Sequence, residues 1–79
     1  MLSIGRLNRD VIFPLREMLF PWCDYVEIAE DTMTGTFDIS IDITEVPIIV
    51  KLRDDSVHIE LGSNIVTIDR DKLAFIVYT

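Results

Sequence analysis

The chain has 79 residues, 49% of them hydrophobic, and a formal net charge of −7. This length limits it to one domain, residues 1–79, and its single cysteine excludes an internal disulfide. Seven cations against fourteen anions argue against direct nucleic-acid binding, which normally requires a basic face.

An N-terminal helix is the first predicted element. Apolar side chains recur at helical spacing within residues 1–22 and form one stripe, made of Leu7, Val11, Leu15, Met18 and Trp22. Asn8 or Asp10 is placed to cap the start of the helix, and Pro21 should end it near Phe20. Because Pro14 suits a first turn better than a helix interior, the helix is expected to cover at least Pro14–Phe20.

After Pro21 the apolar period changes from helical to two, which is typical of half-buried antiparallel strands. Residues 25–29 alternate weakly. Residues 36–44 alternate cleanly, with Phe37 and three isoleucines on one face and acidic or hydroxyl side chains on the other. Thr34–Gly35 marks the turn before them. Shorter runs follow, separated by turn sequences: strands at 48–53, 57–61 and 65–68, and turns at 53–56, 62–64 and 69–71.

The last predicted element is apolar on both faces. Residues 73–78 fit a strand that is covered on both sides or that meets a partner. The stretch 69–75 also permits the start of a short helix. The β-branched pair Ile76–Val77 and the aromatic Tyr78 favour the strand.

These elements predict an α+β fold, in which a short N-terminal helix packs on a five- to six-stranded antiparallel β-meander. The expected core contains the inward-facing apolar residues of the helix and strands, namely Leu15, Met18, Leu19, Trp22, Phe37, Ile39, Ile41, Val50, Leu52, Val57, Ile59, Leu61, Ile68 and Phe75.

No constellation of residues predicts an enzyme, a cofactor or a metal site. Cys23 lies at an apolar helix end, which favours a small buried side chain over a reactive thiol. His58 and Glu60 share the face of one strand. They would meet Asp38 and Asp42 at a divalent cation only if the two strands were adjacent around a pocket. A solvated strand face is expected instead, and a small metal-dependent or acid–base enzyme is the least favoured alternative.

The negative charge is concentrated in the middle of the chain. Residues 21–50 hold seven acidic residues and no Lys or Arg. On a strand, side chains of one face recur every ~6.6–6.8 Å, a spacing comparable to that of single-strand phosphates. We therefore expect a non-enzymatic binding protein whose acidic surface occupies a basic nucleic-acid-binding site on another protein. The expected contact residues are Glu27, Glu30, Asp31, Asp38, Asp42 and Glu45.

The C-terminal strand supports an alternative function. An apolar strand at 72–79 with an unpaired edge can extend a partner's sheet or pair with its own copy across a two-fold axis. The chain would then be a self-associating structural or assembly subunit, at its simplest a homodimer. The residues expected to carry self-association are Phe75, Ile76 and Tyr78.

In size and composition the chain resembles the small acidic inhibitors of phages and other mobile elements, among them anti-restriction and anti-CRISPR proteins that imitate DNA. The resemblance implies inhibition of a partner and assigns no role to any residue. A lone cysteine, the lack of an apolar leader and the absence of ~18 consecutive apolar residues together predict a cytoplasmic protein that binds no membrane.

Overall fold

The computed structural model describes all 79 residues. It contains one α-helix, two short 3-10 helices and seven strands. In chain order these are β1 (Leu2–Leu7), α1 (Arg9–Leu19), η1 (Phe20–Trp22), β2 (Tyr25–Asp31), β3 (Thr36–Asp42), β4 (Ile48–Leu52), β5 (Ser56–Leu61), β6 (Asn64–Asp69), η2 (Arg70–Lys72) and β7 (Phe75–Tyr78).

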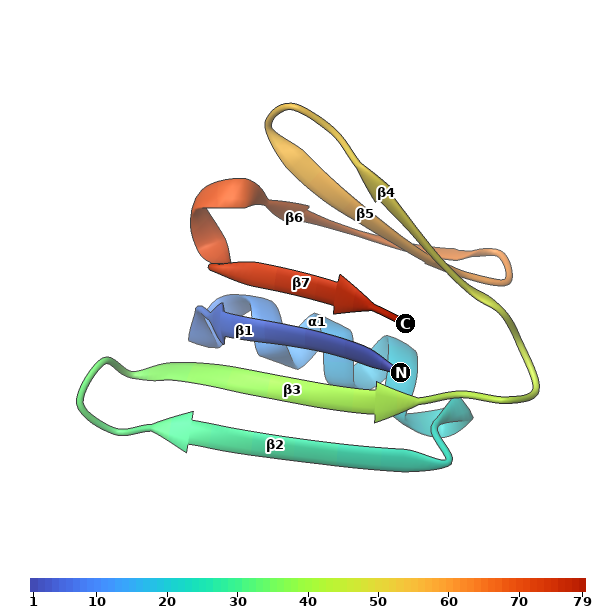
Figure 1. Ribbon diagram of the computed structural model, residues 1–79, viewed down its shortest axis with the longest axis horizontal. Helices are drawn as coiled ribbons and strands as arrows, with labels where there is room; N and C mark the ends of the chain where they lie inside the picture. The colour runs from blue at the N-terminus through green and yellow to red at the C-terminus, as the bar shows by residue number, and fades with distance from the viewer.

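The strands form two antiparallel sheets, a four-stranded one in the order β2-β3-β1-β7 and a three-stranded one in the order β4-β5-β6. Figure 1 shows α1 behind the four-stranded sheet, with the three-stranded sheet beyond β7. The predicted α+β class, one helix packed on antiparallel strands, is confirmed. The predicted single meander of five to six strands is not what the structure contains. Seven strands form two sheets, and in the larger one the N-terminal strand β1 lies between β3 and β7.

Strand β1 is the element that the sequence pattern concealed. Leu2 and Ile4 point inward and are fully buried, as strand alternation requires. A β-bulge then interrupts the register between Ile4 and Leu7, with Arg6 at a φ of 56°. Because the bulge breaks the period of two, Leu7 falls into the rhythm of the following helix and the strand looks helical in the sequence.

Helix α1 begins at Arg9, next to the candidate cap Asn8 and five residues before the predicted minimum span of Pro14–Phe20, and it ends at Leu19. Asn8 has extended backbone angles at the N-cap position, and its carbonyl accepts hydrogen bonds from the Val11 and Ile12 amides. Its side chain makes no cap bond. The helix ends before the 3-10 turn that holds Pro21, and it retains Pro14 in its interior on an exposed side.

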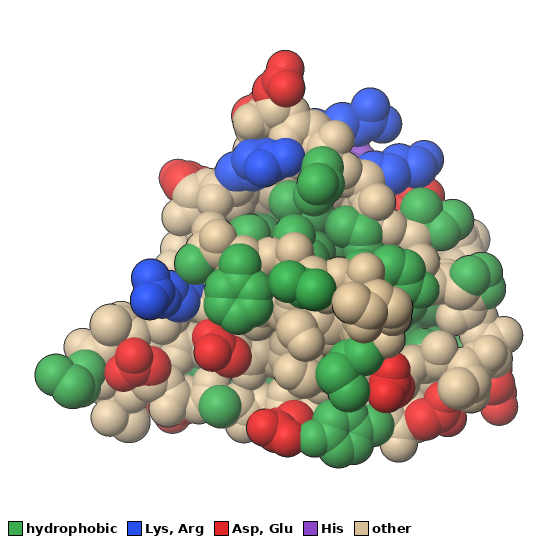
Figure 2. All heavy atoms as spheres, in the orientation of Figure 1, with side chains coloured by type: hydrophobic (Ala, Val, Ile, Leu, Met, Phe, Trp, Pro, Cys, Tyr) green, Lys and Arg blue, Asp and Glu red, His purple; other side chains and the backbone are tan.

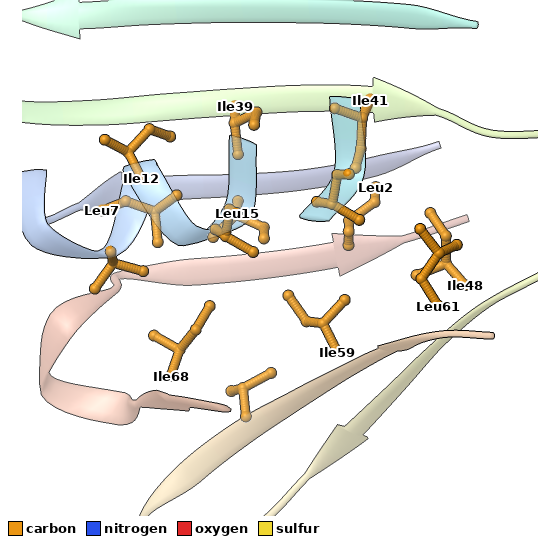
Figure 3. Packing of buried hydrophobic residues seen from close by; sticks show 14 residues of the cluster. Leu2, Leu7, Ile12, Leu15, Ile39, Ile41, Ile48, Ile59, Leu61 and Ile68 are labelled. Carbon is orange, nitrogen blue, oxygen red and sulfur yellow. The ribbon is translucent and has the colours of Figure 1, made fainter. Parts of the chain in front are cut away.

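One hydrophobic cluster joins the helix to both sheets. Figure 3 shows Ile12 and Leu15 of α1 between Ile39 of β3 and Ile59 and Ile68 of the three-stranded sheet. The cluster comprises fourteen buried residues, Leu2, Ile4, Leu7, Val11, Ile12, Leu15, Leu19, Ile39, Ile41, Ile48, Val57, Ile59, Leu61 and Ile68. Eight of them are among the predicted core residues.

Three residues predicted in the core are exposed, and for these the prediction is wrong. Trp22, 42% exposed, lies beyond the end of α1 in η1. Leu52, 60% exposed, is the last residue of edge strand β4, and Phe75, 47% exposed, lies on the far face of its sheet from the helix. The predicted Met18, Phe37 and Val50 are partly buried and pack against the cluster.

The turns follow their sequence signals. Gly35 and Gly62 have positive φ angles of 71° and 62° in the β2–β3 and β5–β6 connections, where glycine carries no Cβ penalty. The Arg53 amide donates to the Ser56 carbonyl across the β4–β5 turn. The C-terminal segment is a strand, β7, and not a helix.

Candidate functional site

The face of the four-stranded sheet that turns away from α1 has no element over it (Figure 1), and we call it the outer face. Strand register decides which side chains lie on it, because residues directly opposite each other share a face. Tyr25 pairs with Asp42, Glu27 with Ser40 and Ala29 with Asp38. Ser40 pairs with Ser3 of β1, Ser3 pairs in turn with Val77 of β7, and Gly5 pairs with Phe75.

The outer face has an acidic half and an apolar half. Figure 2 shows acidic side chains over β2 and β3 and hydrophobic side chains gathered over β7. The acidic half holds four of the six predicted contact residues, Glu27, Asp31, Asp38 and Asp42.

The structure places the other two predicted acids elsewhere. Glu30 alternates onto the opposite side of β2, where one of its carboxylate oxygens lies 3.8 Å from a guanidinium nitrogen of Arg9. Glu45 is exposed in the connection between β3 and β4 and makes no hydrogen bond or ion pair within the chain. The predicted set of six therefore does not form one continuous surface.

Asp38 stabilises the backbone of β1. Its Oδ1 accepts a hydrogen bond of 2.8 Å from the Arg6 amide, the residue that adopts a positive φ in the bulge. A residue other than glycine is uncommon there, and the carboxylate supplies the amide with a charged acceptor. The side chain of Asp38 is thus tied to the fold as well as exposed.

Two further acids of the outer face also have internal partners. Asp31 Oδ1 accepts hydrogen bonds from the Met33 and Thr34 amides at 3.0 and 3.4 Å, which fixes the β2–β3 turn. Asp42 Oδ1 lies 3.2 Å from the amino group of Met1. Neither pairs with a Lys or Arg side chain.

Tyr25 lies among these carboxylates. Its hydroxyl donates a hydrogen bond to Glu27, its neighbour two residues along the same strand face. This bond and the charge of Glu27, with a smaller contribution from Asp42, raise the pKa of the Tyr25 phenol above its ordinary value. The raised pKa therefore reflects first the hydrogen bond that the neutral phenol donates, and then the negative charge beside it.

The apolar half is built on Gly5. The Phe75 ring lies so close over Gly5 that an ideal Cβ at that position would be 1.9 Å from the ring Cε1 atom. Gly5 is buried beneath the ring, while Phe75 and its neighbour Val77 remain 47% and 49% exposed. The glycine therefore lets an aromatic side chain lie flat on the sheet and stay accessible.

The residues expected to carry self-association do not share one face. Phe75 belongs to the outer face, whereas Ile76 and Tyr78 alternate to the other side of β7. Ile76 packs against the hydrophobic cluster, and Tyr78 is 50% exposed. Strand β7 is the last strand in the order of its sheet, and Figure 1 shows the three-stranded sheet beyond its unpaired edge.

The side chains considered for catalysis or metal binding do not meet. Asp38 and Asp42 lie on β3 of one sheet, and His58 and Glu60 lie on β5 of the other. No group of three or more His, Cys, Asp or Glu side chains is placed to hold a metal ion. Burial, with a smaller effect of the Asp24 charge, raises the pKa of the Cys23 thiol, which donates to the Leu19 carbonyl.

The sequence reasoning missed Tyr25, Gly5 and Val77 as parts of the outer face. The weak alternation of residues 25–29 already places Tyr25 beside Glu27. For Gly5 and Val77 no local signal exists, because their neighbourhood depends on the pairing of β1 with β7.

The chain was compared with protein-family models, curated proteins and solved structures, and none of them matches it. None of its helices combines the length and the apolar character needed to cross a membrane.

Proposed function

We propose that this chain is a small non-enzymatic binding protein that uses the outer face to engage a basic surface of another protein. The observation that carries the proposal is the segregation of charge on an uncovered sheet face. Glu27 and Asp31 gather there with Tyr25 and form no ion pair, and Asp42 pairs only with the amino group of Met1. An acidic surface of this kind attracts a basic partner over a distance and speeds the encounter.

A nucleic-acid-binding protein is the partner class that fits this surface best. Carboxylates on one strand face recur every ~6.6–6.8 Å, so a row of them can occupy positions that phosphates occupy in a basic groove. The function would then be inhibition by competitive occlusion. The nearby Phe75 and Val77 add contact area that salt does not weaken, and aromatic side chains often dominate the binding energy of an interface.

The test is capture of binding proteins from a host lysate on the immobilised chain, with washes at low and high salt. The informative variant is Glu27→Lys, because this carboxylate belongs to the acidic half and holds no backbone group. The matched control is Asp54→Lys, which changes the net charge equally at an exposed site outside the outer face. We expect the control to retain a salt-sensitive nucleic-acid-binding protein and the first variant to lose it.

Equal retention by both variants would show that total charge, and not the acidic half, attracts the partner. Elution of the captured protein by competing DNA would identify occlusion, since the DNA and the chain would then share one site.

A second candidate function, self-assembly, rests on one observation: β7 is an edge strand with half-exposed apolar side chains. Sedimentation at low and high salt separates the two functions. An assembly subunit would form an oligomer that is insensitive to salt and is lost on Val77→Asp. A monomer under all conditions would remove this candidate.

A further inference from the structure

A groove runs between the helix and the edge of the three-stranded sheet, away from the outer face. Its wide part is an open hollow of about 470 Å³. Pro14, Glu17 and Met18 of α1 and Pro21–Trp22 of η1 form one wall, and Asn64–Val66 of β6 forms the other. We call this the α1–β6 groove. Its volume lies within the ~300–1,000 Å³ typical of ligand-binding clefts.

What faces the groove from β6 is the edge of the strand. Three consecutive residues line the hollow, although their side chains alternate between the two faces of the sheet. Ile65 pairs with Glu60 on the solvent side, and Val66 pairs with Ile59 on the core side. Asn64, Ile65 and Val66 therefore have only their backbone in common on the side that faces the groove. Since β6 pairs with β5 alone, its other edge carries backbone N–H and C=O groups without a strand partner.

This edge lacks the protection that another edge of the molecule has. Edge strand β2 carries Glu27, Glu30 and Asp31, charges that discourage pairing with a further strand. Strand β6 has no charged residue before Asp69. Farther along its edge a narrower hollow of about 140 Å³ ends beside the ion pair of Lys72 with Asp10. The groove is therefore widest at Asn64–Val66.

The walls of the wide part are apolar with one charge. Trp22 and Ile65 are 42% and 59% exposed, and the Trp22 indole N–H has no hydrogen-bond acceptor within the chain. Glu17 is the only charged side chain lining this part. A ligand that fits has an extended backbone for the β6 edge, an apolar side chain for Trp22 and a cation for Glu17.

We propose that the α1–β6 groove binds an extended peptide segment of a partner protein, rich in apolar residues and carrying Lys or Arg, as an added strand on β6. Main-chain hydrogen bonds to the edge supply affinity in such strand addition, and side-chain pockets supply specificity. The proposal uses residues different from those of the outer face and does not depend on the function proposed for it. A second copy of this chain is a less suitable occupant, because its own β6 brings a helix and two strands with it.

The test begins with selection from a library of capped hexapeptides. The selected peptide is then added to the ¹⁵N-labelled protein. We expect selected peptides to combine apolar residues with Lys or Arg, to perturb the amides of residues 64–67 and the Trp22 indole, and to slow amide exchange along β6. N-methylation of the central peptide amides should weaken binding roughly tenfold, because hydrogen bonds to the edge are lost. Glu17→Gln should weaken it about two- to fivefold, and the matched Asp54→Asn should not change it.

Four results would overturn the proposal. The first is that no hexapeptide is selected, and the second is that the perturbed amides lie only on the outer face. The third is that N-methylated peptides bind equally well. The fourth is that amide exchange along β6 slows as the protein concentration rises, without any peptide. The last result would identify a second copy of the chain as the occupant.

Discussion

Of the two halves of the outer face, the β2–β3 half carries carboxylates and a tyrosine, whereas the β1–β7 half carries no carboxylate and presents an aromatic ring over a glycine. Both are open to solvent: Tyr25 is 45% exposed and Phe75 is 47% exposed. Charge keeps edge strand β2 from pairing and can attract a basic partner at a distance. The apolar half can act only after contact. A partner that uses both halves would bind at a rate that depends on salt and dissociate at a rate that depends on salt less.

The largest expected effect comes from the central strand that joins the two halves. Ile4 on β1 is fully buried, so Ile4→Ala should lower the free energy of unfolding by about 2–5 kcal/mol. Ile28 on edge strand β2 is 36% exposed, so Ile28→Ala should cost clearly less. Urea unfolding monitored by circular dichroism measures both. Equal costs would contradict the assignment of β1 as the shared wall of the core.

The next effect tests how the apolar half is built. Gly5→Ala places a Cβ 1.9 Å from the Cε1 atom of the Phe75 ring, and displacing this half-exposed ring should lower stability by about 1–2 kcal/mol. Phe75→Ala removes the obstacle, so in that background the same glycine substitution should cost much less. A double-mutant cycle in urea gives the coupling energy. Additive costs would show that Phe75 does not lie on Gly5.

A smaller effect distinguishes structural from free carboxylates in the acidic half. Asp38→Ala removes the acceptor of the Arg6 amide and should lower stability by about 1 kcal/mol, which is less than a typical charged hydrogen bond contributes because the site is exposed. Glu27→Ala, which frees no backbone group, should stay within about 0.5 kcal/mol. Thermal unfolding at matched salt compares the two variants. If Glu27→Ala proves the more harmful, Asp38 is not the acid that stabilises the bulge.

The smallest effect is the titration of Tyr25. Its pKa is raised first by the hydrogen bond to Glu27 and by the charge of Glu27, and less by desolvation and by Asp42. In a Tyr78→Phe background the ultraviolet absorbance of the remaining phenol should therefore change with a midpoint above its ordinary value of about 10. Because folding raises this pKa, the stability it contributes is present below pH 10 and is lost as pH rises through the raised value. Glu27→Gln should move the midpoint down. An unchanged midpoint would mean that the two side chains do not interact.

Local patterning was sufficient for the elements whose partners are close in sequence. The alternation at residues 36–44 and the turn glycines Gly35 and Gly62 predict the β2–β3 and β5–β6 hairpins, and Pro21 predicts the end of α1. Strand β1 could not be predicted this way. Its partners β3 and β7 are distant in the chain, and its bulge destroys the period of two.

In the candidate site, too, some features follow from the local sequence and others depend on the pairing of distant strands. That Asp38 and Asp42 share a polar strand face follows from alternation alone. That Glu30 faces the other way, and that Asp38 holds the Arg6 amide, depends on the register of β2 and the bulge of β1. Phe75 was expected in the core because its residue type says nothing about a glycine opposite it across the sheet.

One measurement tests most directly whether the acidic half attracts a basic partner: a ¹⁵N NMR titration of the chain with a capped oligolysine peptide. We expect the largest shifts at the amides of residues 25–31 and 36–42, where no Lys or Arg side chain forms an ion pair with the outer-face carboxylates. Residues 53–55 and 69–72 should shift little, because Arg53, Arg70 and Lys72 lie among their acids. Shifts of equal size in both sets would show that the peptide responds only to the net charge of the protein. That result would contradict the assignment of the outer face as the binding surface.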